Sequence, residues 1–258
     1  ERHRMKLFRY THQGQSRIGV MPAGQSSHFA DLASLVTDVP HEIGALFDPS
    51  VRARVARSLA QTPAAALKPV AGLVFEVPIA QPPKIVCMGL NYADHAKEGG
   101  NARPEYPSFF MRAATSMTPH NGPIVRPKVS PKLDYEAELA IVIGQKARHL
   151  NADNALDCVF GYACFNDGSL RDYQRKSAQW TIGKNFDATG GFGPWLVTPD
   201  ELPRGADGLR IQSRLNGQPA AALSINLTGG VFVNQSAAYS DYHGTGGNPS
   251  ANASYSDS

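Results

Sequence analysis

A run of alternating acidic and apolar residues, followed by branched aliphatic ones, constrains this chain more than any other feature. Residues 134–144 have the sequence Asp-Tyr-Glu-Ala-Glu-Leu-Ala-Ile-Val-Ile-Gly, and the β-branched end bounded by glycine predicts a buried strand. Because side chains alternate between the faces of a strand, Glu136 and Glu138 should point the same way. Leu139, Ile141 and Ile143 should then take the opposite face, toward the core.

Two neighbouring carboxylates in apolar surroundings repel each other and lose hydration, which makes their ionised forms costly. A divalent cation removes both penalties, and ligation by oxygen alone suits Mg²⁺, Mn²⁺ or Ca²⁺ better than Zn²⁺. Glu136 and Glu138 therefore indicate a metal site. The alternative is an exposed edge strand with a solvated acidic face, since short acidic alternations are common on half-exposed sheets.

A third acid follows a second apolar run. Residues 159–167 have the sequence Val-Phe-Gly-Tyr-Ala-Cys-Phe-Asn-Asp, which places Asp167 at the end of a strand. It is a candidate third acid beside the two glutamates. The alternative is a turn residue or a helix N-cap, because Asp followed by Gly and Ser is ordinary between elements.

A histidine and a glutamate lie three residues apart after the apolar strand predicted at residues 85–88. Residues 91–98, Asn-Tyr-Ala-Asp-His-Ala-Lys-Glu, predict a loop and a short helix with His95 and Glu98 on one face. A carboxylate bound to one imidazole nitrogen orients the ring and raises its basicity, so the other nitrogen can take a proton from water. The alternative is a solvent-facing pair that contributes little.

A lysine with apolar neighbours completes the candidate site. Lys184 is flanked by Trp180, Ile182 and Phe186, and it could supply positive charge to a developing oxyanion or enolate. The alternative is a solvated lysine, as most lysines are.

Four of these segments, in this order, resemble the fumarylacetoacetate hydrolase family. The catalytic domain of that family shows Asn-Tyr-x-x-His-x-x-Glu, Asp-Tyr-Glu-x-Glu-Leu, an Asn-Asp strand end and Gly-Lys-x-Phe-Asp. The chain has all four, at residues 91–98, 134–139, 166–167 and 183–187, within a resemblance that runs from about Lys84 to Gly217. The motifs are specific to the family and not to one substrate.

The resemblance implies a role for each matching residue. Metal ligation falls to Glu136, Glu138 and Asp167, which match the positions that bind Mg²⁺ or Mn²⁺. The catalytic residues implied are the water-activating dyad of His95 and Glu98, and Lys184, which stabilises negative charge on the reacting oxygen. The substrate-binding residues implied are Arg112, Arg171 and Gln174. For Arg112 a surface arginine remains the alternative, and Arg171 and Gln174 could instead order the site.

The fold implied by the resemblance is a β-rich α+β fold. It has a distorted, barrel-like β-roll (FAH-like) as catalytic domain, at residues 84–217, and a small N-terminal domain at residues 1–80. A helical stretch is predicted near residues 51–60, and Gln81-Pro82-Pro83 is a credible linker.

The last part of the chain departs from the family pattern. After Arg214 there is no Lys or Arg, although 25 precede that point, and the segment is rich in Ser, Ala, Gly, Asn and Tyr. This composition predicts an atypical polar tail at residues 218–258, open to disorder, in which the C-terminal part of the catalytic domain is missing or replaced.

The function implied is a Mg²⁺- or Mn²⁺-dependent hydrolase that cleaves a C–C bond in an acylpyruvate or fumarylpyruvate-like dioxo acid. The same residues leave other enolate reactions of the family open: 2-oxo acid decarboxylase, hydratase, isomerase or lyase chemistry. An inactive, truncated relative that only binds metal or a partner is also open. The resemblance further implies a homodimer.

Composition excludes some partners. The net charge of +3 is spread over interspersed charges of both signs, with no basic stripe, so a nucleic-acid partner is not expected. Three cysteines in apolar segments, without metal-ligand spacing, predict reduced thiols. No apolar run approaches membrane-spanning length and the start lacks a secretory pattern, so we expect a cytoplasmic protein without a membrane partner.

Overall fold

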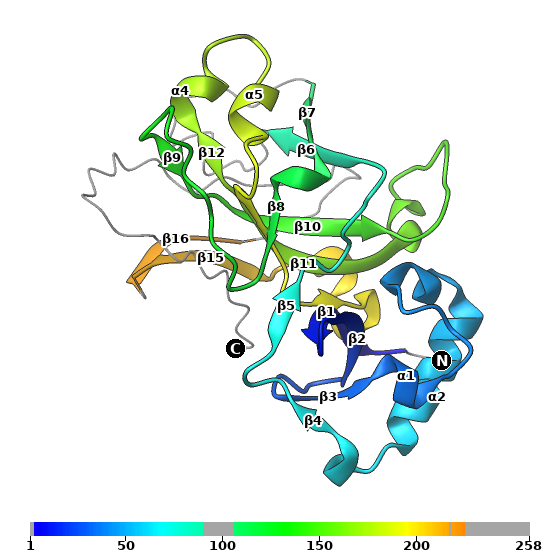
Figure 1. Ribbon diagram of the computed structural model, residues 1–258. Coiled ribbons are helices and arrows are strands. Elements are labelled where there is room, and N and C mark those ends of the chain that lie inside the picture. Colours follow the sequence, from blue (N-terminus) through cyan, green and yellow to red (C-terminus); the bar gives the residue numbers. More distant parts are fainter. Residues whose placement is uncertain (1–2, 90–105, 217, 225–258) are drawn as a thin grey trace. The chain divides into compact units, whose positions relative to one another are not determined.

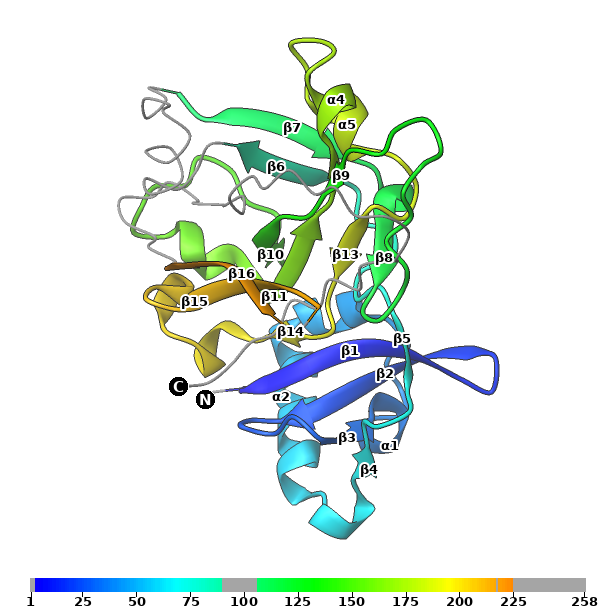
Figure 2. The same ribbon diagram turned by 90° about the vertical axis from the view of Figure 1, so that its left-hand side faces the viewer.

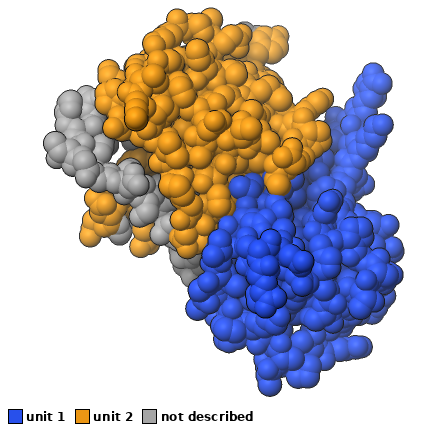
Figure 3. Space-filling model, viewed as in Figure 1, with its two compact units in different colours: residues 1–79, 141–163, 193–207 blue, residues 80–140, 164–192, 208–258 orange. Residues whose placement is uncertain are grey.

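The computed structural model describes residues 3–89, 106–216 and 218–224. Within them the chain is β-rich with few helices, which agrees with the β-rich α+β fold that the family resemblance implied (Figure 1). It divides into two compact units, coloured separately in Figure 3, and each unit combines segments that are distant in sequence. The predicted division into consecutive domains is therefore not the division that the contacts make, although both have a boundary near residue 80.

Unit 1 consists of residues 1–79, 141–163 and 193–207. Its strands are β1 (Met5–His12), β2 (Gln15–Pro22), β3 (His28–Asp31), β4 (Lys68–Pro69), β5 (Val74–Glu76) and β14 (Leu196–Val197). Its helices are α1 (Leu32–Leu35) and α2 (Pro49–Gln61), with 3₁₀ turns at Ile43–Phe47, Ala64–Ala66, Ala155–Cys158, Pro199–Glu201 and Arg204–Ala206. β1 pairs antiparallel with β2, β5 and β14, and β2 continues to β3 and β4 (Figure 2).

One cluster in the core of unit 1 is largely aromatic. Phe8 on β1 packs edge-on against Phe29 with ring centroids 5.0 Å apart, and Tyr10, Met21 and Phe75 complete the buried cluster. Such aromatic pairs stabilise the fold by more than the apolar area that they bury.

The helix α2 confirms the helix predicted at residues 51–60.

Unit 2 consists of residues 80–140, 164–192 and 208–258, of which the described ones carry all the candidate site residues that can be placed. Its strands are β6 (Ile85–Gly89), β7 (Ser108–Arg112), β8 (Met117–Pro119), β9 (Leu133–Asp134), β12 (Ser169–Leu170), β13 (Gly190–Phe192), β15 (Arg210–Leu215) and β16 (Gln218–Ser224). Its helices are α4 (Arg171–Gln174) and α5 (Thr181–Lys184), with a 3₁₀ turn at Ala114–Ser116.

In two longer strands, the first and last residues are assigned to different units. They are β10 (Ala137–Ile143) and β11 (Val159–Asp167), and they pair with each other. Within unit 2, the end of β11 pairs antiparallel with β13, which lies parallel to β8. The short α4 and α5 pack together beside β12, and α5 also contacts β7 (Figures 1 and 2). These elements supply the side chains of the candidate site.

The first residues of the predicted polar tail form the strand β16. β16 pairs antiparallel with β15, from Arg210 opposite Ser224 to Leu215 opposite Gln218. Residues 218–224 are thus part of a hairpin, and the remaining prediction for the tail lies outside the described residues.

Candidate functional site

The two glutamates of the acidic motif are buried. Glu136 precedes β10 and Glu138 lies within it, and their exposed fractions are 3% and 5%. The backbone holds Glu136 from both sides: its N–H donates to Asn166 Oδ1 at 3.0 Å, and its carbonyl accepts from the N–H of Asp167 at 2.9 Å. The alternative of a solvated acidic face is therefore wrong.

The opposite face of this strand departs from the prediction. Leu139 and Ile141 are only partly buried, and Ile143 is 50% exposed. The prediction of a core position is wrong for Ile143, because it is the last residue of β10 and the chain leaves the strand at Gly144. Leu139 does pack against the small cluster formed by Ala137 and Ile211.

Asp167 closes β11 and lies next to Glu136. It is 3% exposed, and Arg112 Nη1 donates to its Oδ1 at 2.5 Å. Since Asp167 is the last residue of a strand and the residue that precedes α4 is Leu170, the helix-cap alternative is wrong. The predicted strand end is confirmed.

Lys184 joins two of the acids. It ends α5 and is 2% exposed, and its Nζ donates to Glu136 Oε2 at 2.6 Å and to Asp167 Oδ2 at 2.7 Å. The ammonium also lies 5.1 Å from the ring centroid of Phe110. The alternative of a solvated lysine is wrong.

Arg112 ends β7 and is also buried, so the surface-arginine alternative is wrong. Besides Asp167, it donates from Nε to Ser116 Oγ at 3.2 Å, from Nη2 to Thr189 Oγ1 at 3.0 Å and from Nη1 to the carbonyl of Gly168 at 3.2 Å. A guanidinium with this many partners is fixed in place, and it fixes Asp167 in turn.

Arg171 and Gln174 lie on α4. Arg171 contacts Oε1 of Glu136, whereas Lys184 contacts Oε2. Arg171 donates from Nε to Asp134 Oδ2 at 2.8 Å and from Nη1 to Gln174 Oε1 at 3.0 Å. Its Nη1 is also 2.5 Å from Glu136 Oε1. The structure thus brings Asp134 into the site.

Sequence reasoning missed Asp134, Ser116 and Thr189. Asp134 stands in the acidic motif, two residues before Glu136, and this spacing was the one signal that could have found it. Ser116 and Thr189 carry no such signal, because they act as acceptors only through the position that the Arg112 guanidinium takes in the fold.

We name Glu136, Glu138 and Asp167 the carboxylate cluster. Burial raises the pKa of Glu136, but the charges of Lys184 and Arg171 outweigh it and bring the pKa down to about 2. For Glu138, burial and then the charges of Glu136 and Asp167 raise the pKa well above its ordinary value. The pKa values of two acids that lie two residues apart are therefore shifted in opposite directions.

Direct contacts explain the low pKa of Glu136, because Lys184 lies against its Oε2 and Arg171 against its Oε1. The negative charges of Glu136 and Asp167 oppose ionisation of Glu138. An added cation would favour the ionised form of Glu138.

The donor set fits a divalent cation by its chemistry. All three members of the carboxylate cluster offer oxygen, which Mg²⁺ and Mn²⁺ prefer. In the described part of the chain, however, no three His, Cys, Asp or Glu side chains converge as a preformed metal site. The ammonium of Lys184 lies between Glu136 and Asp167 instead, so a cation would have to use the lone pairs of these carboxylates that the ammonium leaves free.

The predicted dyad of His95 and Glu98 falls in residues 90–105, outside the described residues. Its role stays a prediction.

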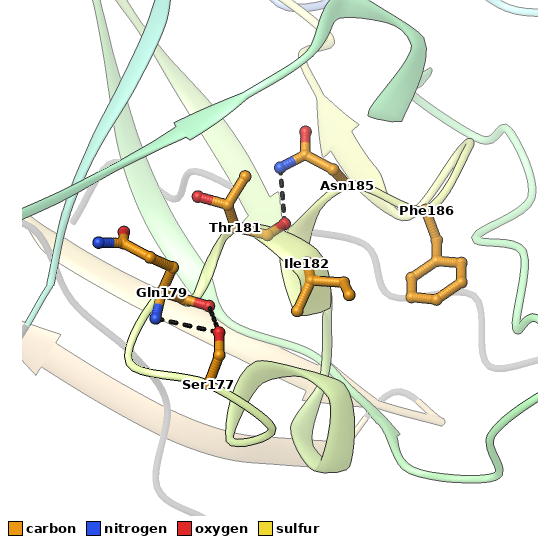
Figure 4. A pocket seen from close by; sticks show the side chains of 6 residues that line it. All are labelled: Ser177, Gln179, Thr181, Ile182, Asn185 and Phe186. Carbon is orange, nitrogen blue, oxygen red and sulfur yellow. Dashed lines mark hydrogen bonds between the residues drawn. The ribbon is translucent and has the colours of Figure 1, made fainter.

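A pocket of about 440 Å³ opens on the outer side of α5. Figure 4 shows the side chains that line it: Ser177, Gln179, Thr181, Ile182, Asn185 and Phe186. Ile182 is 49% exposed there, whereas Lys184 on the same helix is buried in the site. The pocket contains none of the predicted site residues.

Cys87, Cys158 and Cys164 are all free thiols, as predicted. None of the helices in the described ranges is both long and apolar enough to cross a membrane.

Comparison with known proteins gives three kinds of match. A sequence model described as "Fumarylacetoacetate (FAA) hydrolase C-terminal" matches residues 84–229. An uncharacterized protein of Archaeoglobus fulgidus is 41% identical over 150 residues, which cover 58% of this chain and 58% of that protein. The chain thus spans little more than half the length of this relative.

Solved structures share the fold. A fumarylacetoacetate hydrolase from psychrophilic Exiguobacterium antarcticum is 32% identical, with a TM-score of 0.70, over 85% of this chain and 75% of that chain. A maleylpyruvate hydrolase from Sphingobium sp., in complex with manganese(II) ion and pyruvate, is 25% identical, with a TM-score of 0.67, over 85% of this chain and 76% of that chain. The predicted fold class is confirmed by these matches.

Proposed function

Because the chain belongs to the fumarylacetoacetate hydrolase family, we propose that it is a Mg²⁺- or Mn²⁺-dependent hydrolase that cleaves a C–C bond in an acylpyruvate or fumarylpyruvate-like dioxo acid. The observation that carries the proposal is the burial of Glu136, Glu138 and Asp167, with the ammonium of Lys184 held by Glu136 and Asp167. Burying so many charges is costly, and proteins retain such arrangements at functional sites.

The carboxylate cluster would hold the divalent cation. Bound there, the cation would supply a Lewis acid that polarises a substrate carbonyl. The related maleylpyruvate hydrolase structure, which contains manganese(II) and pyruvate, supports both the metal and the substrate class.

Lys184 acts as a fixed positive charge in this proposal. Burial lowers its pKa, but the charges of Asp167 and Glu136 outweigh this and raise the pKa above its ordinary value. The amine therefore stays protonated at neutral pH, so it stabilises negative charge on a reacting oxygen and does not serve as a base.

The general base in the proposal is His95, oriented by Glu98. Neutral imidazole takes a proton from water near neutral pH, which the paired carboxylates and the protonated lysine cannot do equally well. The water then attacks the distal carbonyl, and the C–C bond breaks with its electrons left on the pyruvate fragment as an enolate.

Arg112, Arg171 and Gln174 are proposed to lie near the substrate. Both arginines already donate to acids of the site, so their contribution to substrate binding would come from positive charge and from the remaining donors. A homodimer and a cytoplasmic location remain predictions from the family and the composition.

The proposal is tested with purified protein and a panel of acylpyruvates that includes fumarylpyruvate. Loss of enol absorbance should require Mg²⁺ or Mn²⁺ and stop with EDTA. A His95→Ala variant should lose turnover and keep Mn²⁺ affinity, since its role is proton transfer. Absence of turnover with normal metal binding would contradict the hydrolase and would favour another enolate reaction of the family, such as decarboxylation or isomerisation.

A further inference from the structure

The guanidinium of Arg171 divides its donors between two acids of one motif. Nε donates to Asp134 Oδ2 at 2.8 Å, and Nη1 lies 2.5 Å from Glu136 Oε1. The side chains of Arg171 and Asp134 are 14% and 15% exposed, and that of Glu136 is 4% exposed. These ion pairs are thus largely desolvated, where geometry matters more than for exposed pairs.

Backbone pairing fixes the first of these contacts. β9 and β12 pair antiparallel, with Asp134 opposite Ser169 and Leu133 opposite Leu170. The next residue, Arg171, donates its backbone N–H to the carbonyl of Lys132 at 3.0 Å. Asp134 and Arg171 are therefore diagonal neighbours across the two-strand ladder, a separation that a long side chain can span.

Glu136 is held through both of its oxygens. Oε2 accepts from Lys184 at 2.6 Å, and Oε1 lies against Arg171. Rotation of this carboxylate would break one contact or the other. Lys184 also donates to Asp167, so Glu136 shares that cation and has a second one in Arg171.

We propose that Asp134 and Arg171 are positioning residues, which fix the carboxylate of Glu136 in the orientation that a divalent cation needs. The inference rests on the proposed function, because it assumes that Glu136 is a ligand. Asp134 thereby has a role in the site, and the main role of Arg171 is to orient Glu136 and not to bind substrate. Partners that orient a metal ligand are typically worth a factor of about 10–100 in metal affinity.

The test compares Mn²⁺ affinity, measured by electron paramagnetic resonance, for the full chain and for two variants. Asp134→Asn keeps the shape of the side chain and removes its charge. Arg171→Lys keeps a positive charge and removes the fork that reaches two acids. The matched control is Asp157→Asn, which also removes the charge of an Asp paired with an Arg, here the exposed pair with Arg204.

We expect both site variants to bind Mn²⁺ about 10–100-fold more weakly than the wild type, and the control to bind within about twofold of it. The double variant should lose no more than the weaker-binding single variant, because both act on Glu136 through one chain of contacts. Thermal unfolding identifies any variant that fails to fold, and Arg171→Lys then stands in for Asp134→Asn. Wild-type Mn²⁺ affinity in folded Asp134→Asn, with only a raised KM, would overturn the inference and return Arg171 to substrate binding.

A crystal structure of Asp134→Asn separates this inference from the proposed function. If the wild type itself does not bind Mn²⁺, the metal proposal fails, and the position of Glu136 in the variant still shows whether Asp134 and Arg171 fix its carboxylate. We expect the Glu136 carboxylate to lose its contact with Arg171. An unchanged contact would overturn the positioning role.

Discussion

The ammonium of Lys184 lies 2.6 Å from Glu136 Oε2, although 48 residues separate the two in the sequence. The same ammonium lies 2.7 Å from Asp167. One helix end therefore bridges the residue before β10 and the last residue of β11, so the electrostatics of the site depend on this contact.

Replacing Lys184 should show how much the bridge stabilises the protein. Lys184→Met leaves two buried carboxylates without their shared cation, and breaking a buried pair in this way costs about 3–5 kcal/mol. We expect this loss in the free energy of unfolding by urea with EDTA present, and a smaller loss with Mn²⁺. The exposed Lys128→Met is the control and should resemble the wild type. Equal stability of Lys184→Met and the wild type would show that the bridge contributes nothing.

The charge of Glu138 should make the metal-free protein sensitive to pH. Burial and then the charges of Glu136 and Asp167 raise the pKa of Glu138 in the folded state. Such a group stabilises the fold below its unfolded pKa, and the contribution is lost as pH rises through the folded pKa.

In EDTA, the melting temperature should therefore fall as pH rises above the ordinary range of a glutamate, and Glu138→Gln should weaken this fall. Mn²⁺ affinity should rise with pH over the same range, because a ligand must lose its proton before it binds. The exposed Asp153→Asn serves as control. If the melting temperature of Glu138→Gln changed with pH in parallel with that of the wild type, the fall would not come from Glu138.

Gly183 allows α5 to approach α4. A Cβ on Gly183 would lie 2.4 Å from the backbone nitrogen of Gln174, so one of the two helices would have to shift. Gly183→Ala should destabilise the protein by about 1–3 kcal/mol and lower activity, because α4 and α5 carry Arg171 and Lys184.

Gly44→Ala is the matched control, since a Cβ there meets no atom within 4 Å. Thermal unfolding and kcat would be compared for the two alanine variants. Similar values for both would mean that the close approach of the helices does not matter.

The thiols should be unreactive in the folded protein. Cys87 is buried, and this burial, with a smaller contribution from the charge of Asp167, raises the pKa of its thiol. Because the thiolate is the reactive form, iodoacetamide at about pH 8 should leave Cys87 unmodified until urea unfolds the chain. Mass spectrometry before and after unfolding checks this, and fast labelling of the native protein would contradict the burial.

Local patterns in the sequence predicted several elements correctly. The apolar run before Asn166 and Asp167 predicted a strand that ends at Asp167, and β11 does so. The helix predicted at residues 51–60 corresponds to α2, where Asp48 caps the first turn and Val55 and Leu59 form the buried stripe. In each case the signal is a periodicity over several residues.

The contacts around Arg171 and Arg112 could not be predicted in the same way. β9 and β12 are two residues long, so no periodicity announces the pairing that sets Asp134 beside Arg171. The burial of Arg112 depends on Ser116, Thr189 and Asp167, which come from three different segments. Local patterns also failed for Ile143, since alternation predicts a face and cannot tell where the strand leaves the core.

The most direct test of the account is a crystal of the full chain soaked in Mn²⁺ and measured for anomalous scattering. One strong peak is expected within ligand distance of the carboxylates of Glu136, Glu138 and Asp167, and no such peak is expected in crystals of Glu138→Gln. A fully soaked wild-type crystal with no peak among these three side chains, or with Mn²⁺ bound elsewhere only, would contradict the metal site on which the proposed function depends.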